Sequence, residues 1–235
     1  MIGAVAPDAV LFDLDDTLID YSGNVEACWD AACAGVASAG LDPTAVALAI
    51  HAVREWFWSD PVRHRRERVD MIGAWTKIAA QALDRVGHPS ELLARAIATD
   101  FAARRMATTV LFDDALPCLR ALAARGIPLG LVTNGDAGMQ REKLARFDLG
   151  PHFAVIVIEG EFGAGKPDAA VYRHALSVLG TRPAATMMVG DNFGWDVAGA
   201  NEAGLAGVWL DRAGRGIPKD TAPARVIRSL AELVY

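Results

Sequence analysis

Six short apolar runs, most of them separated by helical patterns, constrain the fold of this chain more than any other feature. The runs are AVLF (9–12), PLGLV (128–132), AVIVI (154–158), TMMV (186–189), AGVWL (206–210) and ARVI (224–227). They are apolar along nearly their whole length instead of alternating with polar residues, which is typical of strands covered on both faces. Strands that alternate with helices predict an α/β fold built on a doubly wound parallel sheet.

Residues from about 19 to 104 interrupt this alternation. They contain long amphipathic stretches and no convincing strand, and they predict four helices, within 24–40, 43–58, 69–87 and 90–106. We therefore expect a helical domain at 19–104, inserted into a core that is formed by 1–18 and 105–235.

The charge and composition exclude several function classes. A net charge of −6 and a pI near 5.4 argue against a general nucleic-acid binder, which needs positive charge to neutralise phosphates. No apolar run approaches the roughly 18 residues of a membrane span, and the first residues lack the pattern of a signal peptide. Three scattered cysteines do not make a disulfide framework, so we expect reduced thiols and a cytoplasmic location.

Polar side chains follow four of the predicted strands, directly or after a short loop. In chain order these residues are Asp13, Asp15 and Thr17; Thr133 and Asn134; Lys166; and Asp191, Asn192 and Asp196. Ligands of an open parallel sheet bind outside the carboxyl ends of its strands. We therefore expect these four groups to converge at one edge of the sheet, although the sequence separates them widely.

The residue types of this set suit phosphate chemistry. Several carboxylates at one point favour a hard cation such as Mg²⁺. A lysine, a threonine hydroxyl and backbone N–H groups suit the oxygens of a phosphate. One carboxylate can attack phosphorus and form an aspartyl-phosphate, and a second can move protons to and from the reacting oxygens.

The segments DLDDT, TNG, KPD and GDNFGWD resemble the four motifs of the haloacid dehalogenase (HAD) superfamily, and they occur in the same order. The helical insert resembles the C1-type cap of family members with a four-helix lid. This resemblance implies a Rossmann-like core, a hydrolase, and Mg²⁺ as the cofactor.

The resemblance also implies a role for each residue. Asp13 would be the nucleophile and Asp15 the general acid and base, with Thr133 and Lys166 completing the catalytic set. Phosphate binding would fall to Thr133, Asn134 and Lys166. The metal would be held by Asp13, Asp191 and the backbone carbonyl of Asp15, with support from Thr17, Asn192 and Asp196.

Asp15 favours one activity within the superfamily. Relatives that act on 2-haloacids lack an Asp at this position, and phosphonoacetaldehyde hydrolases also lack it and use a cap lysine, for which Lys77 is the only candidate. We expect a Mg²⁺-dependent phosphomonoesterase acting on a small metabolite of the sugar phosphate or nucleoside monophosphate type. A phosphomutase, a 2-haloacid dehalogenase and a non-catalytic phospho-acceptor or binding protein are the alternatives.

The predicted cap has an arginine-rich segment at 54–70. We take Arg63 and Arg66 as candidates for holding an anionic substrate, because arginine suits carboxylate and phosphate groups. The alternative is a solvated helix face on which these arginines pair with Glu67 and Asp70. We expect a small phosphorylated substrate as the partner, and neither nucleic acid nor a membrane. The expected oligomeric state is a monomer or a homodimer.

Overall fold

The computed structural model describes residues 7–218 and 222–234 and divides the chain into two compact units. The first unit comprises Met1–Asp20 and Val110–Tyr235, and the second comprises Tyr21–Thr109. The helical unit ends later than the expected residue 104, because its last helix, α5 (Glu91–Thr108), continues through the ARRM sequence to Thr108.

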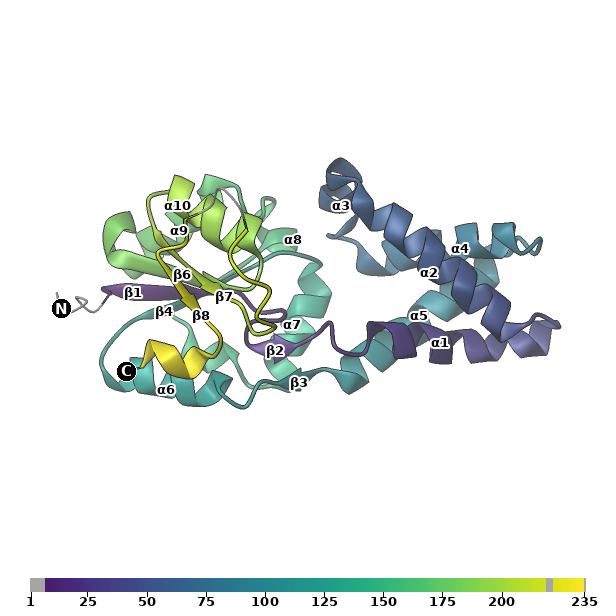
Figure 1. The fold of residues 1–235 in the computed structure, drawn as a ribbon, viewed down its shortest axis with the longest axis horizontal. Helices are drawn as coiled ribbons and strands as arrows, with labels where there is room; N and C mark the ends of the chain where they lie inside the picture. Colours follow the sequence, from purple (N-terminus) through teal and green to yellow (C-terminus); the bar gives the residue numbers. More distant parts are fainter. Residues whose placement is uncertain (1–6, 219–221, 235) are drawn as a thin grey trace. The chain divides into compact units, whose positions relative to one another are not determined.

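Six parallel strands form the sheet of the first unit, in the order β5-β4-β1-β6-β7-β8 (Figure 1). The strands are β1 (Ala9–Phe12), β4 (Leu129–Thr133), β5 (Val155–Ile158), β6 (Thr186–Gly190), β7 (Ala206–Leu210) and β8 (Arg225–Ile227). The predicted doubly wound α/β fold is confirmed. In register, Phe12 of β1 pairs with Leu131 of β4 and Val189 of β6, so the polar segments after these strands begin at the same edge.

Helices cover both faces of this sheet. The helices α9 (Ala169–Leu179) and α10 (Gly199–Glu202) lie on one face, and α6 (Ala115–Ala124) lies on the other with the short helix η5 (Leu230–Leu233) (Figure 1). Leu11 of the central strand packs in a core cluster with Tyr172 of α9 and Ala200 of α10. This apolar packing holds the sheet rigidly against its helices, and the polar residues follow the ends of its strands.

Short elements supplement this frame. β2 (Ile19–Asp20) and β3 (Val110–Leu111) form an antiparallel pair where the chain leaves and re-enters the first unit. The helices α7 (Ala137–Arg146) and α8 (Glu159–Phe162) follow β4 and β5, and a π-helix, η4 (Phe193–Ala198), follows β6. The 3-10 turns η2 (Gly150–His152) and η3 (Pro183–Ala185) lead into β5 and β6.

The second unit contains the four predicted helices and one more. The predicted ones correspond to α1 (Val25–Cys33) with the 3-10 turn η1 (Ala34–Ala39), α2 (Pro43–Ser59), α4 (Met71–Arg85) and α5. The additional helix, α3 (Pro61–Glu67), holds three of the five arginines of the arginine-rich segment and begins with Asp60 as its N-cap. Trp29 stacks on Phe101 at 3.7 Å between ring centroids, and Trp75 packs edge-on against the same ring. These two tryptophans therefore belong to the apolar interior of the unit.

Within 7–218 and 222–234, no helix combines the length and the apolar character that a membrane crossing requires.

Candidate active site

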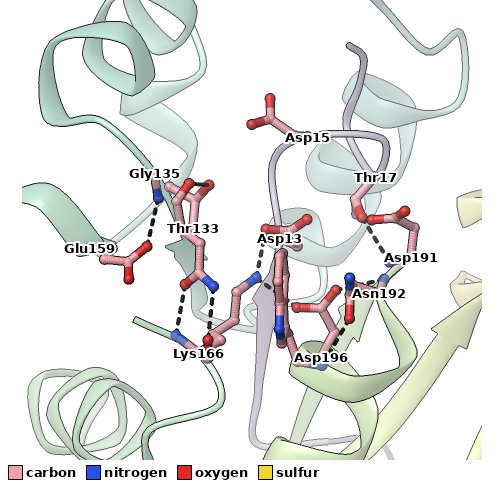
Figure 2. Close-up of polar contacts among 12 residues, drawn as sticks. Asp13, Asp15, Thr17, Thr133, Gly135, Glu159, Lys166, Asp191, Asn192 and Asp196 are labelled. Atoms are coloured by element: carbon pink, nitrogen blue, oxygen red, sulfur yellow. Dashed lines mark hydrogen bonds and ion pairs between the residues drawn. The ribbon is translucent and has the colours of Figure 1, made fainter. Parts of the chain in front are cut away.

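Four strand ends bring the predicted polar residues together (Figure 2). Asp13 follows β1, Thr133 ends β4, Lys166 lies in the loop after β5 and α8, and Asp191 follows β6. Their side chains lie at the carboxyl edge of the sheet because β1 is bonded to β4 and β6 in parallel register. The convergence that the sequence predicted is therefore observed.

Lys166 is the centre of this arrangement. Its ammonium donates to Asp13 Oδ1 and to Asp196 Oδ1, each at 2.6 Å, and its side chain is almost fully buried. Burial disfavours the charged amine, but the two carboxylates outweigh that effect and raise the pKa of Lys166 above its usual value. Lys166 therefore carries a fixed positive charge against Asp13.

We call Asp13, Asp191 and Asp196 the acidic cluster, because each offers a carboxylate oxygen within 4.8 Å of the others. Burial raises the pKa of Asp13, although Lys166 opposes this. Burial, with the charges of Asp196 and Asp16, raises the pKa of Asp191 to about 7. When all three are ionised, these carboxylates carry more negative charge than the single ammonium of Lys166 neutralises. A set of oxygen ligands with excess negative charge fits a hard divalent cation such as Mg²⁺.

The loop after β6 is braced by its own side chains. Asp196 accepts from the backbone N–H of Asn192 through Oδ2 at 3.0 Å, and Asn192 Oδ1 accepts from the N–H of Trp195 at 3.0 Å. The hydroxyl of Thr17, which is fully buried, accepts from the N–H of Asp191 at 3.1 Å. Asn192, Asp196 and Thr17 thus fix the backbone around Asp191.

Asn134 braces the loop that carries Lys166. The Asn134 side chain donates to the backbone carbonyl of Lys166 at 2.9 Å and accepts from its N–H at 2.7 Å. Next to it, the N–H of Gly135 donates to the Glu159 carboxylate at 2.9 Å. Thr133, which is buried, is thereby held between two fixed loops.

Asp15 lies outside the acidic cluster. Figure 2 shows its carboxylate directed away from Asp13, although only one residue separates them in the sequence. Its partners are Lys143, at 2.7 and 2.9 Å from its two oxygens, and Gln140, at 3.1 Å. Neither of these two α7 residues was among the predicted site residues.

Two signals in the sequence could have indicated these residues. Only four of the 23 basic residues are lysines, so a lysine is unusual in this chain. Gln140 and Lys143 are also three positions apart, which places them on one helix face together with Leu144, the next residue on that face.

The two candidate arginines of the cap belong to the helical unit. The Arg63 guanidinium donates to the carbonyls of Phe57 and Trp56, each at 2.6 Å, and stacks 4.0 Å above the Trp56 ring. Arg66 pairs with Glu67 at 2.8 Å, and its side chain is 69% exposed. Arg63 therefore closes the end of α2, whereas Arg66 extends into solvent beyond its pair.

Known proteins resemble this chain in sequence. A phosphoserine phosphatase from Thermus thermophilus is 35% identical over 78% of this chain and 74% of the relative. A glyceraldehyde 3-phosphate phosphatase from Methanopyrus kandleri is 31% identical, over 87% of this chain and 84% of the relative.

Solved structures resemble it in fold. A HAD-hydrolase from Bacillus subtilis, YfnB, bound to magnesium, superposes with a TM-score of 0.76 at 19% identity, covering 97% of both chains. A 2-haloacid dehalogenase from Pseudomonas syringae pv. tomato has a TM-score of 0.69 at 26% identity, covering 97% of this chain and 96% of that one.

The family model for haloacid dehalogenase-like hydrolases matches residues 7–204, which include every polar strand end described above. Two relatives are more than 30% identical over most of both chains, so the comparison of whole sequences supports the same family as the family model. The chain belongs to the haloacid dehalogenase-like hydrolases.

Proposed function

We propose that this protein is a Mg²⁺-dependent phosphomonoesterase that acts on a small phosphorylated metabolite through an aspartyl-phosphate on Asp13. One observation carries the proposal: Asp13 is paired with a buried lysine inside an acidic cluster, while a second carboxylate, Asp15, is held outside that cluster. Two carboxylates in different surroundings suit two different tasks, attack on phosphorus and proton transfer.

The first half-reaction transfers the phosphoryl group to the protein. An Asp13 carboxylate oxygen forms a bond to phosphorus while the bond from phosphorus to the ester oxygen breaks. Protonated Asp15 gives its proton to that oxygen, so the product leaves as a neutral alcohol. Lys166 and the Thr133 hydroxyl offset the charge of the transferred group, because each lies at the same strand edge as Asp13.

The second half-reaction returns the protein to its starting state. The Asp15 carboxylate takes a proton from a water molecule as the water oxygen attacks phosphorus. The bond between phosphorus and Asp13 breaks, phosphate leaves, and Asp13 is again a carboxylate. Asp15 is then protonated and ready for the next ester.

Asp13, Asp191 and the backbone carbonyl of Asp15 would hold the metal ion, with Asn192 and Asp196 orienting the loop around it. When bound, Mg²⁺ supplies positive charge beside the phosphoryl oxygens and the crowded carboxylates. The raised pKa values of Asp13 and Asp191 support this assignment, because both report uncompensated negative charge next to burial.

The class of substrate rests on the relatives. Their names specify phosphoserine, glyceraldehyde 3-phosphate and N-acylneuraminate 9-phosphate, which are all small monoesters with different alcohol parts. Arg66 remains our candidate for contacting the alcohol part. Arg63 is the weaker candidate, because its guanidinium already closes α2.

The test is phosphate release from a panel of phosphomonoesters in Mg²⁺ and in EDTA. The panel contains sugar phosphates, nucleoside monophosphates, phosphoserine and glyceraldehyde 3-phosphate. We expect release that requires Mg²⁺ and is lost in Asp13→Asn. The matched control is Asp113→Asn, which makes the same chemical change at an exposed carboxylate of the same unit and should keep activity.

Other outcomes distinguish the alternatives. Isomerisation of a sugar phosphate without phosphate release would indicate the phosphomutase, and halide release from a 2-haloacid would indicate the dehalogenase. A protein that accepts a phosphoryl group on Asp13 but never releases phosphate would be the phospho-acceptor. Release that persists in Asp13→Asn would contradict the proposed nucleophile.

A further inference from the structure

Helix α7 buries two polar side chains next to the site. Gln140 and Lys143 are each only 2% exposed, although α7 is a mainly polar helix that follows the loop after β4. Burying a lysine costs free energy unless its charge is paired and its hydrogen bonds are made. A helix that only covered the sheet would be more stable with apolar residues at these positions.

Their contacts converge on Asp15. Lys143 Nζ donates to Asp15 Oδ1 at 2.7 Å, to Asp15 Oδ2 at 2.9 Å and to Gln140 Oε1 at 2.7 Å. Gln140 Nε2 donates to Asp15 Oδ2 at 3.1 Å. The orientation of the Gln140 amide is fixed, because the Lys143 ammonium can only donate, so the amide oxygen faces Lys143 and the amide nitrogen faces Asp15. Asp15 is thus held at both oxygens from one helix face.

Gln140 also reaches the residue proposed to bind the phosphoryl group. Its Nε2 donates to Thr133 Oγ1 at 2.6 Å and to the Asn134 carbonyl at 3.1 Å. The Thr133 hydroxyl itself makes a long contact, 3.4 Å, to the same carbonyl. Gln140 therefore directs the Thr133 hydroxyl to act as a donor, and it fixes Asp15 relative to that donor.

We propose that Gln140 and Lys143 are positioning residues that hold the Asp15 carboxylate in place for proton transfer to the leaving group. This inference rests on the proposed phosphatase function and adds two residues to it. As Asp15 gives its proton to the ester oxygen it becomes a carboxylate, and Lys143 stabilises the charge that forms there. Without the pair, the partly exposed Asp15 side chain would lose its fixed position, and small displacements of a reacting group lower rates strongly.

The test separates protonation of the leaving group from other steps. Single-turnover release of the alcohol or phenol is measured with enzyme in excess, for the best alkyl phosphate of the panel and for 2,4-dinitrophenyl phosphate. Dinitrophenolate leaves without a proton, so it does not need Asp15. In Lys143→Met we expect release from the alkyl ester to fall about 100-fold, while release of dinitrophenolate falls less than about threefold.

A double-mutant cycle gives a second readout. If Lys143 acts through Asp15, Lys143→Met has no further effect on alkyl ester cleavage once Asp15→Asn is present. The matched control is Arg141→Gln, which changes the neighbouring residue of α7, whose side chain is half exposed and pairs with Glu161. We expect it to cleave both esters as the wild type does. Melting temperatures of all variants report folding.

Two results would overturn the inference while leaving the phosphatase function intact. One is an equal loss on both esters by a well-folded Lys143→Met variant, and the other is an additive effect of Lys143→Met in the Asp15→Asn background. A wild-type protein that cleaves none of the esters overturns the proposed function itself, and the inference with it.

Discussion

Replacing Lys166 by methionine tests the electrostatics of the site without reference to any substrate. The substitution keeps the length of the side chain and removes the positive charge that pairs with both Asp13 and Asp196, which are almost completely buried. Two carboxylates then remain in the interior without their shared cation. In EDTA no divalent ion can replace it, so the unfolding free energy should fall.

The magnitude has an upper limit. Removing one partner of a buried ion pair costs about 3–5 kcal/mol. The loss of unfolding free energy cannot greatly exceed about 5 kcal/mol at pH 7.5. At about that cost a carboxyl group of ordinary pKa takes up a proton and no longer carries an unpaired charge. In a chain of this size, each kcal/mol of lost stability lowers the melting temperature by about 2–4 °C. We therefore expect the melting temperature to fall by roughly 6–20 °C.

The loss should also depend on pH. The pKa of Asp13 is raised by burial in the wild type, despite Lys166, and it should rise further in Lys166→Met. A folded state with a raised carboxyl pKa binds a proton that the unfolded state releases, so the stability of the variant increases as the pH falls. Each proton that only the folded state binds adds about 2.7 kcal/mol to the unfolding free energy between pH 7.5 and pH 5.5.

The assay is calorimetry in EDTA at the two pH values, which separates the transitions of the two units if they unfold independently. Arg141→Met is the control, because it removes an exposed ion pair worth less than about 1 kcal/mol. The reasoning is refuted if Lys166→Met melts within a few degrees of the wild type at pH 7.5, or if its deficit is the same at pH 5.5.

Three further predictions concern single contacts. Thr17→Val removes the buried acceptor of the Asp191 N–H, so we expect about tenfold more Mg²⁺ for half-maximal activity, with Thr17→Ser restoring the wild-type titration. The hydrogen bond from Lys77 lowers the pKa of Glu67 in the helical unit. The stabilising effect of this pair is therefore present above the pKa of Glu67 in the unfolded chain, near 4.5, and is lost as the pH falls. Between pH 7 and pH 3, calorimetry should therefore show a smaller loss of stability for Lys77→Met than for the wild type. An equal loss of stability would contradict the pairing. Gly190→Ala would place a Cβ 2.1 Å from a carboxylate oxygen of the acidic cluster, so activity should fall at least about 100-fold, and a variant with near-normal activity would show that the loop can move aside.

The main features of the fold were predictable because the strands are buried on both faces. Such strands need nearly continuous apolar residues, and that pattern is visible in the sequence for five of them, whereas the edge strand β8 begins with an exposed arginine. β2 and β3 were not predicted, because two residues each are too few to show a period. The helix α3 was missed because its residues, PVRHRRE, have no apolar face, and its start depends on Asp60 and Pro61 at the N-terminus.

The site was predictable where topology alone brings residues together. Parallel strands in the order β4-β1-β6 place the residues after them at one edge, whatever their separation in sequence. The partners of Asp15 could not be found in this way. They lie within α7, more than 120 positions from Asp15, and only the packing of this helix on the sheet brings them near it.

The two lysines of the site share a geometry that explains why this chain, with 19 arginines, has lysine there. Lys166 donates to two carboxylates from a side chain that is 1% exposed, and Lys143 donates to Asp15 and Gln140 from one that is 2% exposed. An ammonium is small and directs three hydrogens to separate acceptors, whereas a guanidinium is planar and needs acceptors arranged around its fork. Acceptors that converge on one point inside a closed interior therefore require lysine. By this argument Lys166 and Lys143 do the same physical task for Asp13 and Asp15, each holding one carboxylate in its own place, as the proposed roles of nucleophile and proton carrier require.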